Sequence, residues 1–283
     1  MHHYIILGLK MKIISSALEL KRYLKNENHT IGYVPTMGAL HEGHIALIKE
    51  ARNNNEVVVV SIFVNPTQFL ASEDLQKYPR RDEADKKICE LAGVDVLFMP
   101  HAEELYFEDE VKIVAPNVRG YVLEGATRPG HFSGVLRVVM KLLNIVNPTN
   151  AYFGKKDAQQ LNLIELMVKQ YFMDVNIIAV DTVRDADGLA LSSRNVYLSK
   201  EQRQEALKIP KSLYEASKMV SRGVIDVIEI KKQMLTILEP LEIGYVAILS
   251  REFEPIDEVV IGESIILVEA LVGDTRLLDN IWL

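Results

Sequence analysis

The feature that most constrains the fold is the run of β-branched and aromatic residues over 57–64. Such a run, without polar alternation, is typical of a strand buried on both faces of a sheet. We expect further strands at 30–35, 94–98, 151–153 and 175–180, and helices at 44–52, 81–92, 133–146 and 157–171. Strands that alternate with helices predict a parallel sheet with right-handed crossovers.

Local signals set the ends of these elements. Pro35 ends the first strand because it has no amide hydrogen, and Gly93 is a stop signal for the helix before it. The helix at 133–146 is expected to end before Pro148, and Asp157 is expected to cap the next helix. The predicted fold class is therefore α/β, with a Rossmann-like parallel sheet flanked by helices.

The character of the chain changes after about residue 200. Helices are expected at 200–220 and 224–238, followed by strands at 245–249, 265–272 and 277–282. This order predicts a second, smaller α/β domain. We place the boundary so that residues 1–181 form the Rossmann-like domain and residues 182–283 form the smaller one.

Composition excludes some classes of partner. The chain has 283 residues, a net charge of −7 and a pI of about 5.6, which argues against a broad surface for DNA or RNA. No apolar run reaches the roughly 18 residues that a membrane span needs. Residues 1–10 lack the basic start and the cleavage site of a signal peptide, and Met11 is a second possible start. We expect neither a nucleic-acid partner nor a membrane partner.

The cysteine content indicates a compartment. Cys89 is the one cysteine of the sequence and cannot form an internal disulfide, which fits a reducing compartment and hence the cytoplasm. It lies in the helix expected at 81–92. We therefore expect a small core residue there rather than a nucleophile.

The first cluster of unusual residues follows the strand at 30–35 and comprises Met37, Gly38, Ala39, Leu40, His41, Glu42, Gly43 and His44. His41 and His44 are three residues apart at a helix start, so both rings can face one way from its positive end. Backbone N–H groups at that end favour phosphate. A helix cap with two surface histidines would explain an isolated pair, but the position directly after a buried strand favours a functional role.

The second cluster follows the strand at 57–64 and contains Gln68. A neutral amide offers donors and an acceptor without charge. Gln68 could therefore position a hydroxy acid without neutralising a carboxylate that must attack. Taken alone, it would be read as a turn residue.

The third cluster, Gly154, Lys155, Lys156 and Asp157, again stands between a strand and a helix. Either lysine could reach a phosphate as a compact cation. Asp157 could cap the helix or accept a hydrogen bond from a ribose hydroxyl. Gln160 lies three residues further on, on the same helix face.

The fourth cluster follows the strand at 175–180. Asp187-Gly188 signals a tight turn, and Ser192, Ser193 and Arg194 supply hydroxyl donors and a guanidinium suited to β- and γ-phosphates. A solvated hairpin with a surface arginine is the alternative. All four clusters follow predicted strands, and ligands of parallel sheets bind beyond the carboxyl ends of the strands.

In this order and spacing the clusters resemble those of pantothenate synthetases, over essentially the whole chain from Met11. The first resembles the His-x-Gly-His signature of nucleotidyltransferases and class I aminoacyl-tRNA synthetases. Leu191–Arg194 is similar to that superfamily's mobile Lys-Met-Ser-Lys-Ser loop. The resemblance implies an ATP-dependent ligase that activates pantoate as an acyl-adenylate and transfers it to β-alanine, giving pantothenate, AMP and pyrophosphate. It also implies Mg²⁺ with ATP, a C-terminal lid domain and a homodimer.

The resemblance also implies roles for individual residues. His41, His44, Lys156 and Arg194 would be catalytic, with His44 as a proton donor. Gln68 would contact both pantoate and β-alanine, and Gln160 would contact pantoate. No residue is assigned as a metal ligand. The ATP site would comprise Met37, Gly38, Ala39, Leu40, His41, Glu42, Gly43, His44, Gly154, Lys155, Lys156, Asp157, Val183, Leu191, Ser192, Ser193 and Arg194.

Three other functions compete with this interpretation. One is a nucleotidyltransferase that adenylylates a phosphorylated acceptor; release of AMP would indicate ligation, whereas a dinucleotide-like product would indicate transfer. The second is an RNA-binding synthetase-like module, which the acidic balance disfavours. The third is a nucleotide-binding regulatory protein that has lost catalytic activity. The four intact clusters argue against it.

Overall fold

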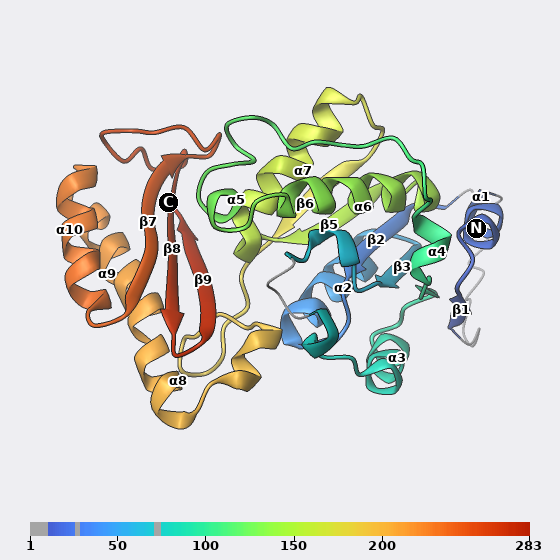
Figure 1. The fold of residues 1–283 in the computed structure, drawn as a ribbon, viewed down its shortest axis with the longest axis horizontal. Coiled ribbons are helices and arrows are strands. Elements are labelled where there is room, and N and C mark those ends of the chain that lie inside the picture. Colours follow the sequence, from blue (N-terminus) through green and yellow to red (C-terminus); the bar gives the residue numbers. More distant parts are fainter. Residues whose placement is uncertain (1–10, 26–28, 71–74) are drawn as a thin grey trace, which may run out of the picture. The chain divides into compact units, whose positions relative to one another are not determined.

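The computed structural model describes residues 11–25, 29–70 and 75–283 (Figure 1). Residues 1–10, which precede the second possible start at Met11, lie outside the described residues. The chain divides into two compact units. The first extends to Phe153 and includes Leu163–Val180; the second consists of Gly154–Asn162 and Asp181–Leu283. The ligand-binding roles assigned to the two predicted domains stay a prediction.

The first unit is built on a six-stranded sheet in the order β1-β4-β3-β2-β5-β6. Parallel pairing joins β1 to β4, β4 to β3, and β2 to both β3 and β5, which confirms the predicted fold class. The strands are β1 Lys12–Ile14, β2 Ile31–Thr36, β3 Val57–Ile62, β4 Val96–Phe98, β5 Asn150–Gly154 and β6 Asn176–Val180.

The strand order reverses direction at β2. From β2 the chain proceeds to β3 and β4 on one side, and it then returns to place β5 and β6 on the other. The junction between β2 and β5 is therefore a topological switch point, where open parallel sheets bind ligands beyond their carboxyl ends. The first and third clusters follow these two strands directly.

Helices and short helical turns connect the strands in Figure 1. They are α1 Ala17–Lys25, α2 Glu42–Asn54, η1 Pro66–Gln68, η2 Leu75–Lys77, α3 Asp82–Leu91, α4 Ala102–Leu105, α5 Glu124–Thr127, α6 His131–Val146, η3 Lys155–Asp157 and α7 Ala158–Gln170. The sequence pattern did not indicate β1 or α1. The helix expected from residue 157 is α7, which begins at Ala158 directly after the 3₁₀ turn η3.

The centre of β2 and β3 is apolar and fully buried, as the run at 57–64 predicted. Tyr33 and Ser61 are the polar exceptions, and their hydroxyl groups form a 2.7 Å hydrogen bond with each other. Burial raises the pKa of Tyr33 far above its usual value. Cys89 is fully buried, as expected, and burial raises the pKa of its thiol to about 12. It therefore stays protonated at neutral pH and is a poor nucleophile.

A buried amide at the end of α2 ties that helix to β5. Asn55 Nδ2 donates to Ala51 O at 2.8 Å and to the Tyr152 hydroxyl at 2.7 Å, while Asn55 Oδ1 accepts from Asn150 Nδ2 at 2.8 Å. The side chain lies against Gly32, where an added Cβ would come 2.5 Å from Asn55 Nδ2. Glycine is therefore required at position 32 of β2 because the Asn55 side chain comes so close.

The second unit has an antiparallel sheet in the order β7-β8-β9 with helices on it. Its elements are η4 Ser193–Tyr197, α8 Lys200–Ala206, α9 Lys208–Ser221, α10 Val227–Leu238, β7 Glu242–Ser250, β8 Ser264–Val272 and β9 Thr275–Trp282. A single helix at 200–220 was wrong. The chain breaks between α8 and α9 because Pro210 has no N–H to donate to the carbonyl of Ala206.

Replacement of Gly32 by Ala tests the packing of the Asn55 amide. We expect Gly32→Ala to lower the free energy of unfolding by about 1–3 kcal/mol, because overpacking forces buried neighbours to shift. Urea unfolding followed by circular dichroism measures this. Gly154→Ala is the matched control, since no atom lies within 4 Å of its Cβ position and its φ is −78°. Equal stabilities of the two variants would contradict the packing argument.

Candidate active site

The two histidines of the first cluster form the cap of helix α2. His41 is the N-cap residue, and its Nδ1 accepts from Gly43 N at 3.2 Å. His44 Nδ1 accepts in turn from His41 N at 3.3 Å, and the ring centroids are 4.1 Å apart. Because each Nδ1 accepts a backbone hydrogen bond, each neutral ring carries its proton on Nε2. The helix start thus holds two imidazole N–H donors side by side.

The glycine between the histidines is required by the His41 ring. A Cβ on Gly43 would come 2.9 Å from His41 Cε1. In the structure, its missing side chain gives space to the chain's own imidazole.

The turn before the histidines is held by Asp85, a residue of α3 that sequence reasoning missed. Its Oδ2 accepts from Ala39 N and its Oδ1 from Leu40 N, each at 2.8 Å, and Asp85 is only 1% exposed. The turn also needs positive φ values, 84° at Gly38 and 50° at Ala39. A carboxylate that satisfies two consecutive N–H groups fixes this left-handed backbone, because buried backbone donors without a partner would be costly.

Gln68 lies at the end of the 3₁₀ turn η1, next to the first cluster. Its Nε2 donates to Met37 Sδ at 2.9 Å, and its Oε1 accepts from Asn65 Nδ2 at 3.0 Å. Asn65, also missed, is 1% exposed and accepts from the Tyr106 hydroxyl at 2.6 Å. Buried amides and hydroxyls that satisfy each other hold a side chain in one orientation. The Gln68 amide is therefore fixed in direction.

The backbone of Gln68 is fixed from the other side. His131 Nδ1 lies 2.8 Å from Gln68 O, and Arg128 Nη1 lies 3.0 Å from His131 Nε2. A carbonyl can only accept and a guanidinium can only donate, so His131 carries its proton on Nδ1. Helix α6 comes so close to η1 that a Cβ on Gly134 would lie 2.2 Å from Thr67 O. Arg128, His131 and Gly134 thus support the Gln68 turn.

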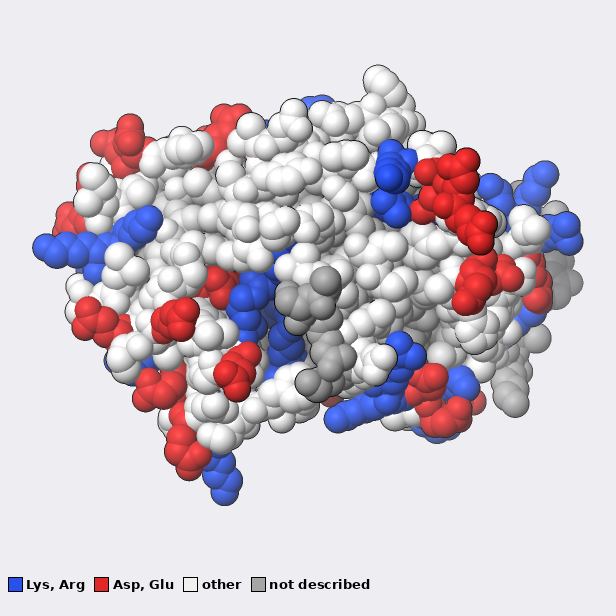
Figure 2. Space-filling view, in the orientation of Figure 1, with Lys and Arg blue, Asp and Glu red and all other residues white. Residues whose placement is uncertain are grey.

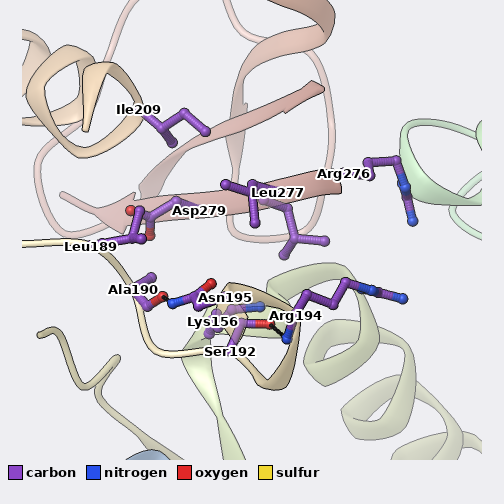
Figure 3. A pocket seen from close by; sticks show the side chains of 11 residues that line it. Lys156, Leu189, Ala190, Ser192, Arg194, Asn195, Ile209, Arg276, Leu277 and Asp279 are labelled. Atoms are coloured by element: carbon purple, nitrogen blue, oxygen red, sulfur yellow. Dashed lines mark hydrogen bonds between the residues drawn. The ribbon is translucent and has the colours of Figure 1, made fainter. Parts of the chain in front are cut away.

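Lys156 of the third cluster and Arg194 of the fourth line one pocket of the second unit (Figure 3). Ser192 Oγ accepts from Arg194 N at 3.3 Å and caps η4, so the serine and the arginine are fixed relative to each other. The lining residues are Lys156, Leu189, Ala190, Ser192, Arg194, Asn195, Ile209, Arg276, Leu277, Leu278 and Asp279. Arg276 was not among the predicted residues.

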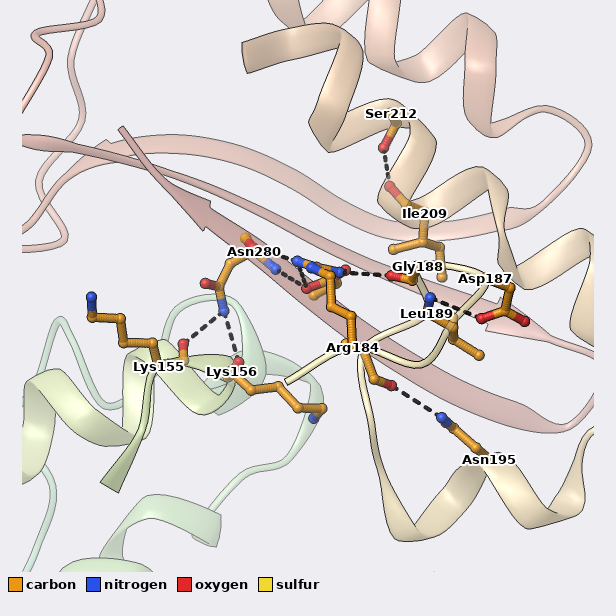
Figure 4. Close-up of polar contacts among 12 residues, drawn as sticks. Lys155, Lys156, Arg184, Asp187, Gly188, Leu189, Asn195, Ile209, Ser212 and Asn280 are labelled. Carbon is orange, nitrogen blue, oxygen red and sulfur yellow. Dashed lines mark hydrogen bonds and ion pairs between the residues drawn. The ribbon is translucent and has the colours of Figure 1, made fainter. Parts of the chain in front are cut away.

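The structure distinguishes the two lysines of the third cluster, which extend in opposite directions in Figure 4. Lys155 Nζ forms a 2.6 Å ion pair with Asp181 and lies 5.9 Å from the centre of the Trp282 ring. Lys156 lines the pocket, with its Nζ 3.4 Å from Asp157 Oδ1. Lys156 is therefore the better candidate for a phosphate contact.

The fourth cluster begins with the predicted tight turn. Arg184 and Ala190 form an antiparallel bridge, and Gly188, with φ of 93°, donates to Asp185 O at 2.8 Å. Leu191 N then donates to Val183 O at 3.0 Å, which closes the hairpin directly before Ser192. The predicted ATP-site residues Val183 and Leu191 thus form one backbone pair.

Comparisons with known proteins agree on one family. A family profile described as pantoate–β-alanine ligase matches residues 12–282. This chain belongs to the pantoate–β-alanine ligase family. A pantothenate synthetase of Sulfurimonas denitrificans is 67% identical over 96% of this chain and its own full length, and one of Aliarcobacter butzleri is 55% identical with the same coverage.

Solved structures of pantoate–β-alanine ligases agree. The pantothenate synthetase of Thermus thermophilus has a TM-score of 0.91 and 41% identity, covering 96% of this chain and 99% of that one. The pantoate–β-alanine ligase of Francisella tularensis, complexed with β-γ ATP and β-alanine, has a TM-score of 0.80 and 36% identity, covering 96% and 97%. The predicted family and the predicted enzyme class, a ligase, are confirmed.

The structure places the predicted site residues in two groups. The first unit brings together the turn and helix start at 37–44 with Gln68; the second brings together Lys156, Ser192 and Arg194. Gln160 lies in the first turn of α7, half-buried. That all of them contact one bound ATP and pantoate stays a prediction.

Over residues 11–25, 29–70 and 75–283, no helix combines the length and apolar character that a bilayer crossing demands. On the face shown in Figure 2, some Lys and Arg side chains gather in one group near the centre, and others are interspersed with Asp and Glu.

Asp85→Asn tests how far the active-site turn depends on one carboxylate. An amide can accept from only one of the two N–H groups and presents a donor to the other, so we expect a loss of about 1–3 kcal/mol in unfolding free energy. Urea unfolding measures it. Asp82→Asn is the control, because Asp82 is exposed in the first turn of the same helix and should cost only a few tenths. Wild-type stability of Asp85→Asn would contradict the clamp.

Proposed function

We propose that this chain condenses pantoate with β-alanine in two chemical steps, consuming ATP and releasing AMP and pyrophosphate. The observation that carries the proposal is the pair of imidazole N–H donors capping α2 beyond the carboxyl end of β2, beside the switch point of the sheet. Membership of the pantoate–β-alanine ligase family supports the substrates. The complex of the Francisella tularensis enzyme with β-γ ATP and β-alanine supports two of them independently.

In the first step a pantoate carboxylate oxygen attacks the α-phosphorus of ATP. The new P–O bond forms as the bond to the β-phosphate oxygen breaks, and pyrophosphate leaves on the opposite side. His41 and His44 donate from Nε2 to the α-phosphate oxygens, which gain charge in the transition state. His44 is the proposed proton donor of the pair. Their fixed place at a helix N-terminus adds the favourable field of the backbone N–H groups.

Gln68 is proposed to hold the pantoate. Its amide is neutral, so it can orient a hydroxy acid while leaving the carboxylate nucleophilic. The contacts with Asn65 and Met37 fix the amide before substrate arrives, which lowers the entropy cost of orientation. Gln160 is the second proposed pantoate contact, and Gln68 also contacts β-alanine in the second step.

The second unit supplies the cations and hydroxyls for the remaining phosphates. Lys156, Ser192, Ser193 and Arg194 are proposed to hold the β- and γ-phosphates and then the departing pyrophosphate. Mg²⁺ enters with ATP as part of the substrate. Magnesium ions at such sites keep phosphate oxygens and water as most of their ligands, and among the described residues no three His, Cys, Asp or Glu side chains gather into a metal cage.

In the second step the free-base amine of β-alanine attacks the carbonyl of pantoyl-adenylate. The C–N bond forms, the bond to the AMP oxygen breaks, and the amine proton passes to solvent or to a histidine. Retention of the adenylate away from water is the task proposed for the smaller domain acting as a lid. We further propose a homodimer and a cytoplasmic location; the buried, protonated Cys89 suits a reducing compartment.

Isotope exchange tests the first step by itself. With pantoate, Mg²⁺ and ATP but no β-alanine, we expect label to pass from pyrophosphate into ATP, because adenylate formation is reversible on the enzyme. Omission of pantoate should abolish the exchange. Exchange that requires β-alanine would rule out the two-step scheme.

His44→Ala tests the role of the capping histidines. We expect kcat to fall roughly 10²-fold or more, because a donor aimed at developing charge is lost. The rate of pantothenate formation measures it. His101→Ala is the control, since His101 is exposed and forms no side-chain cap on α4. Near-wild-type turnover of folded His44→Ala would remove His44 from the mechanism.

A further inference from the structure

Strand β9 contains a buried amide that holds the backbone of the predicted phosphate-binding lysine. Asn280 is 3% exposed, and its Nδ2 donates to Lys155 O at 2.9 Å and to Lys156 O at 2.7 Å (Figure 4). Its Oδ1 has no hydrogen-bond partner among the described residues. Both hydrogens of the Asn280 amide therefore bind the backbone of Lys155 and Lys156. Only a side chain with two N–H donors on one nitrogen can form both of these hydrogen bonds.

The neighbouring residue of β9 holds the hairpin that leads to Ser192. Asp279 is 3% exposed and accepts from Arg184 Nη1 at 2.6 Å and from Nη2 at 3.0 Å. Arg184 Nη1 also lies 3.1 Å from Gly188 O, across the turn of the same hairpin. A two-pronged guanidinium–carboxylate pair fixes direction as well as distance. The hairpin is thus locked to β9 through the side chain of Arg184.

These polar residues interrupt an apolar strand. Leu277 and Ile281 pack in the core of the second unit, and Asp279 occupies the position between them on the same face. A carboxylate at such a position destabilises the fold unless it is paired. A residue that departs from the local sequence pattern in this way is expected to have a functional role.

We propose that Asn280 and Asp279 are positioning residues for the phosphates of ATP, an inference that rests on the proposed function. Asn280 sets the backbone from which Lys156 extends, and Asp279 sets the hairpin from which Ser192 and Arg194 follow. Because the two are adjacent in β9, one strand keeps both cation-bearing segments in a fixed register. Asp279 lines the pocket, but both of its carboxylate oxygens are paired with Arg184, and Asn280 is not among the lining residues. Both are therefore proposed to act through Lys156, Ser192 and Arg194 rather than by binding phosphate themselves.

Asn280→Asp gives the first test. The change is nearly isosteric but sets carboxylate oxygens against two carbonyl oxygens, which should displace Lys156. A misplacement of about 1 Å can cost up to roughly 10²-fold in rate, so we expect kcat/KM for ATP to fall at least tenfold with the KM for β-alanine unchanged. Asn162→Asp is the matched control: Asn162 is similarly buried in the same unit, and its Nδ2 donates to the single carbonyl of Arg251 at 3.0 Å. It should keep kcat/KM for ATP within a few-fold.

Double-mutant cycles separate positioning from general loosening. If Asn280 acts through Lys156, Asn280→Ala should have little further effect in a Lys156→Ala background, yet should add to Arg194→Ala. Asp279→Asn should show the reverse, coupling to Arg194→Ala and adding to Lys156→Ala. Simple additivity in all four combinations would overturn the proposal.

Hydrogen exchange tests the anchoring by Asn280 even if the activity of a variant is too low to measure. In folded Asn280→Ala, amides of 155–162 should exchange faster while those of β8 keep their protection. Unchanged exchange at 155–162 would refute the anchoring. If the wild type makes no pantothenate, the proposed function fails and exchange still tests the anchor. If the wild type is active and folded Asn280→Asp keeps its kcat/KM for ATP, only the positioning proposal fails.

Discussion

The parallel pairing of β2 with β3 on one side and β5 on the other is the constraint on which the candidate site depends. Tyr33 stands opposite Val59 in one neighbour and opposite Ala151 in the other. Parallel strands end on the same edge, so the chain segments that leave them begin at that edge. Three of the four predicted clusters start there, before any property of their individual residues is considered.

Much of this could be predicted from the sequence, because buried strands and glycine turns leave local patterns. The run at 57–64 became β3, and the histidine pair marked the start of α2. Errors arose where the pattern was too short or was broken by one residue. Lys12–Ile14 is only three residues long, and Pro210 divides a segment that is otherwise helical in character.

Apart from Asn65, the supporting residues could not be predicted, since each acts across a long stretch of chain. Asp85 lies 46 residues from the N–H group of Ala39 that it binds, and Asn280 lies 125 residues from Lys155. A lone Asp on a helix or an Asn in a strand has no periodic signal. Asn65 could have been suspected, because Asn before Pro at a strand end is a turn signal, but its bond to Gln68 needs the fold.

The two units fix their functional groups in different ways, and the difference suits the chemistry proposed for each. In the first unit the side chains themselves are held: His41 and His44 by the helix cap, and Gln68 by Asn65. In the second unit, the backbone of Lys156 is held by a hydrogen bond, whereas the bonds of its long side chain can still rotate. Attack at the α-phosphorus requires donors that do not move as charge develops. Pyrophosphate must be bound and then released, and a Lys156 side chain that can rotate on a fixed backbone permits both.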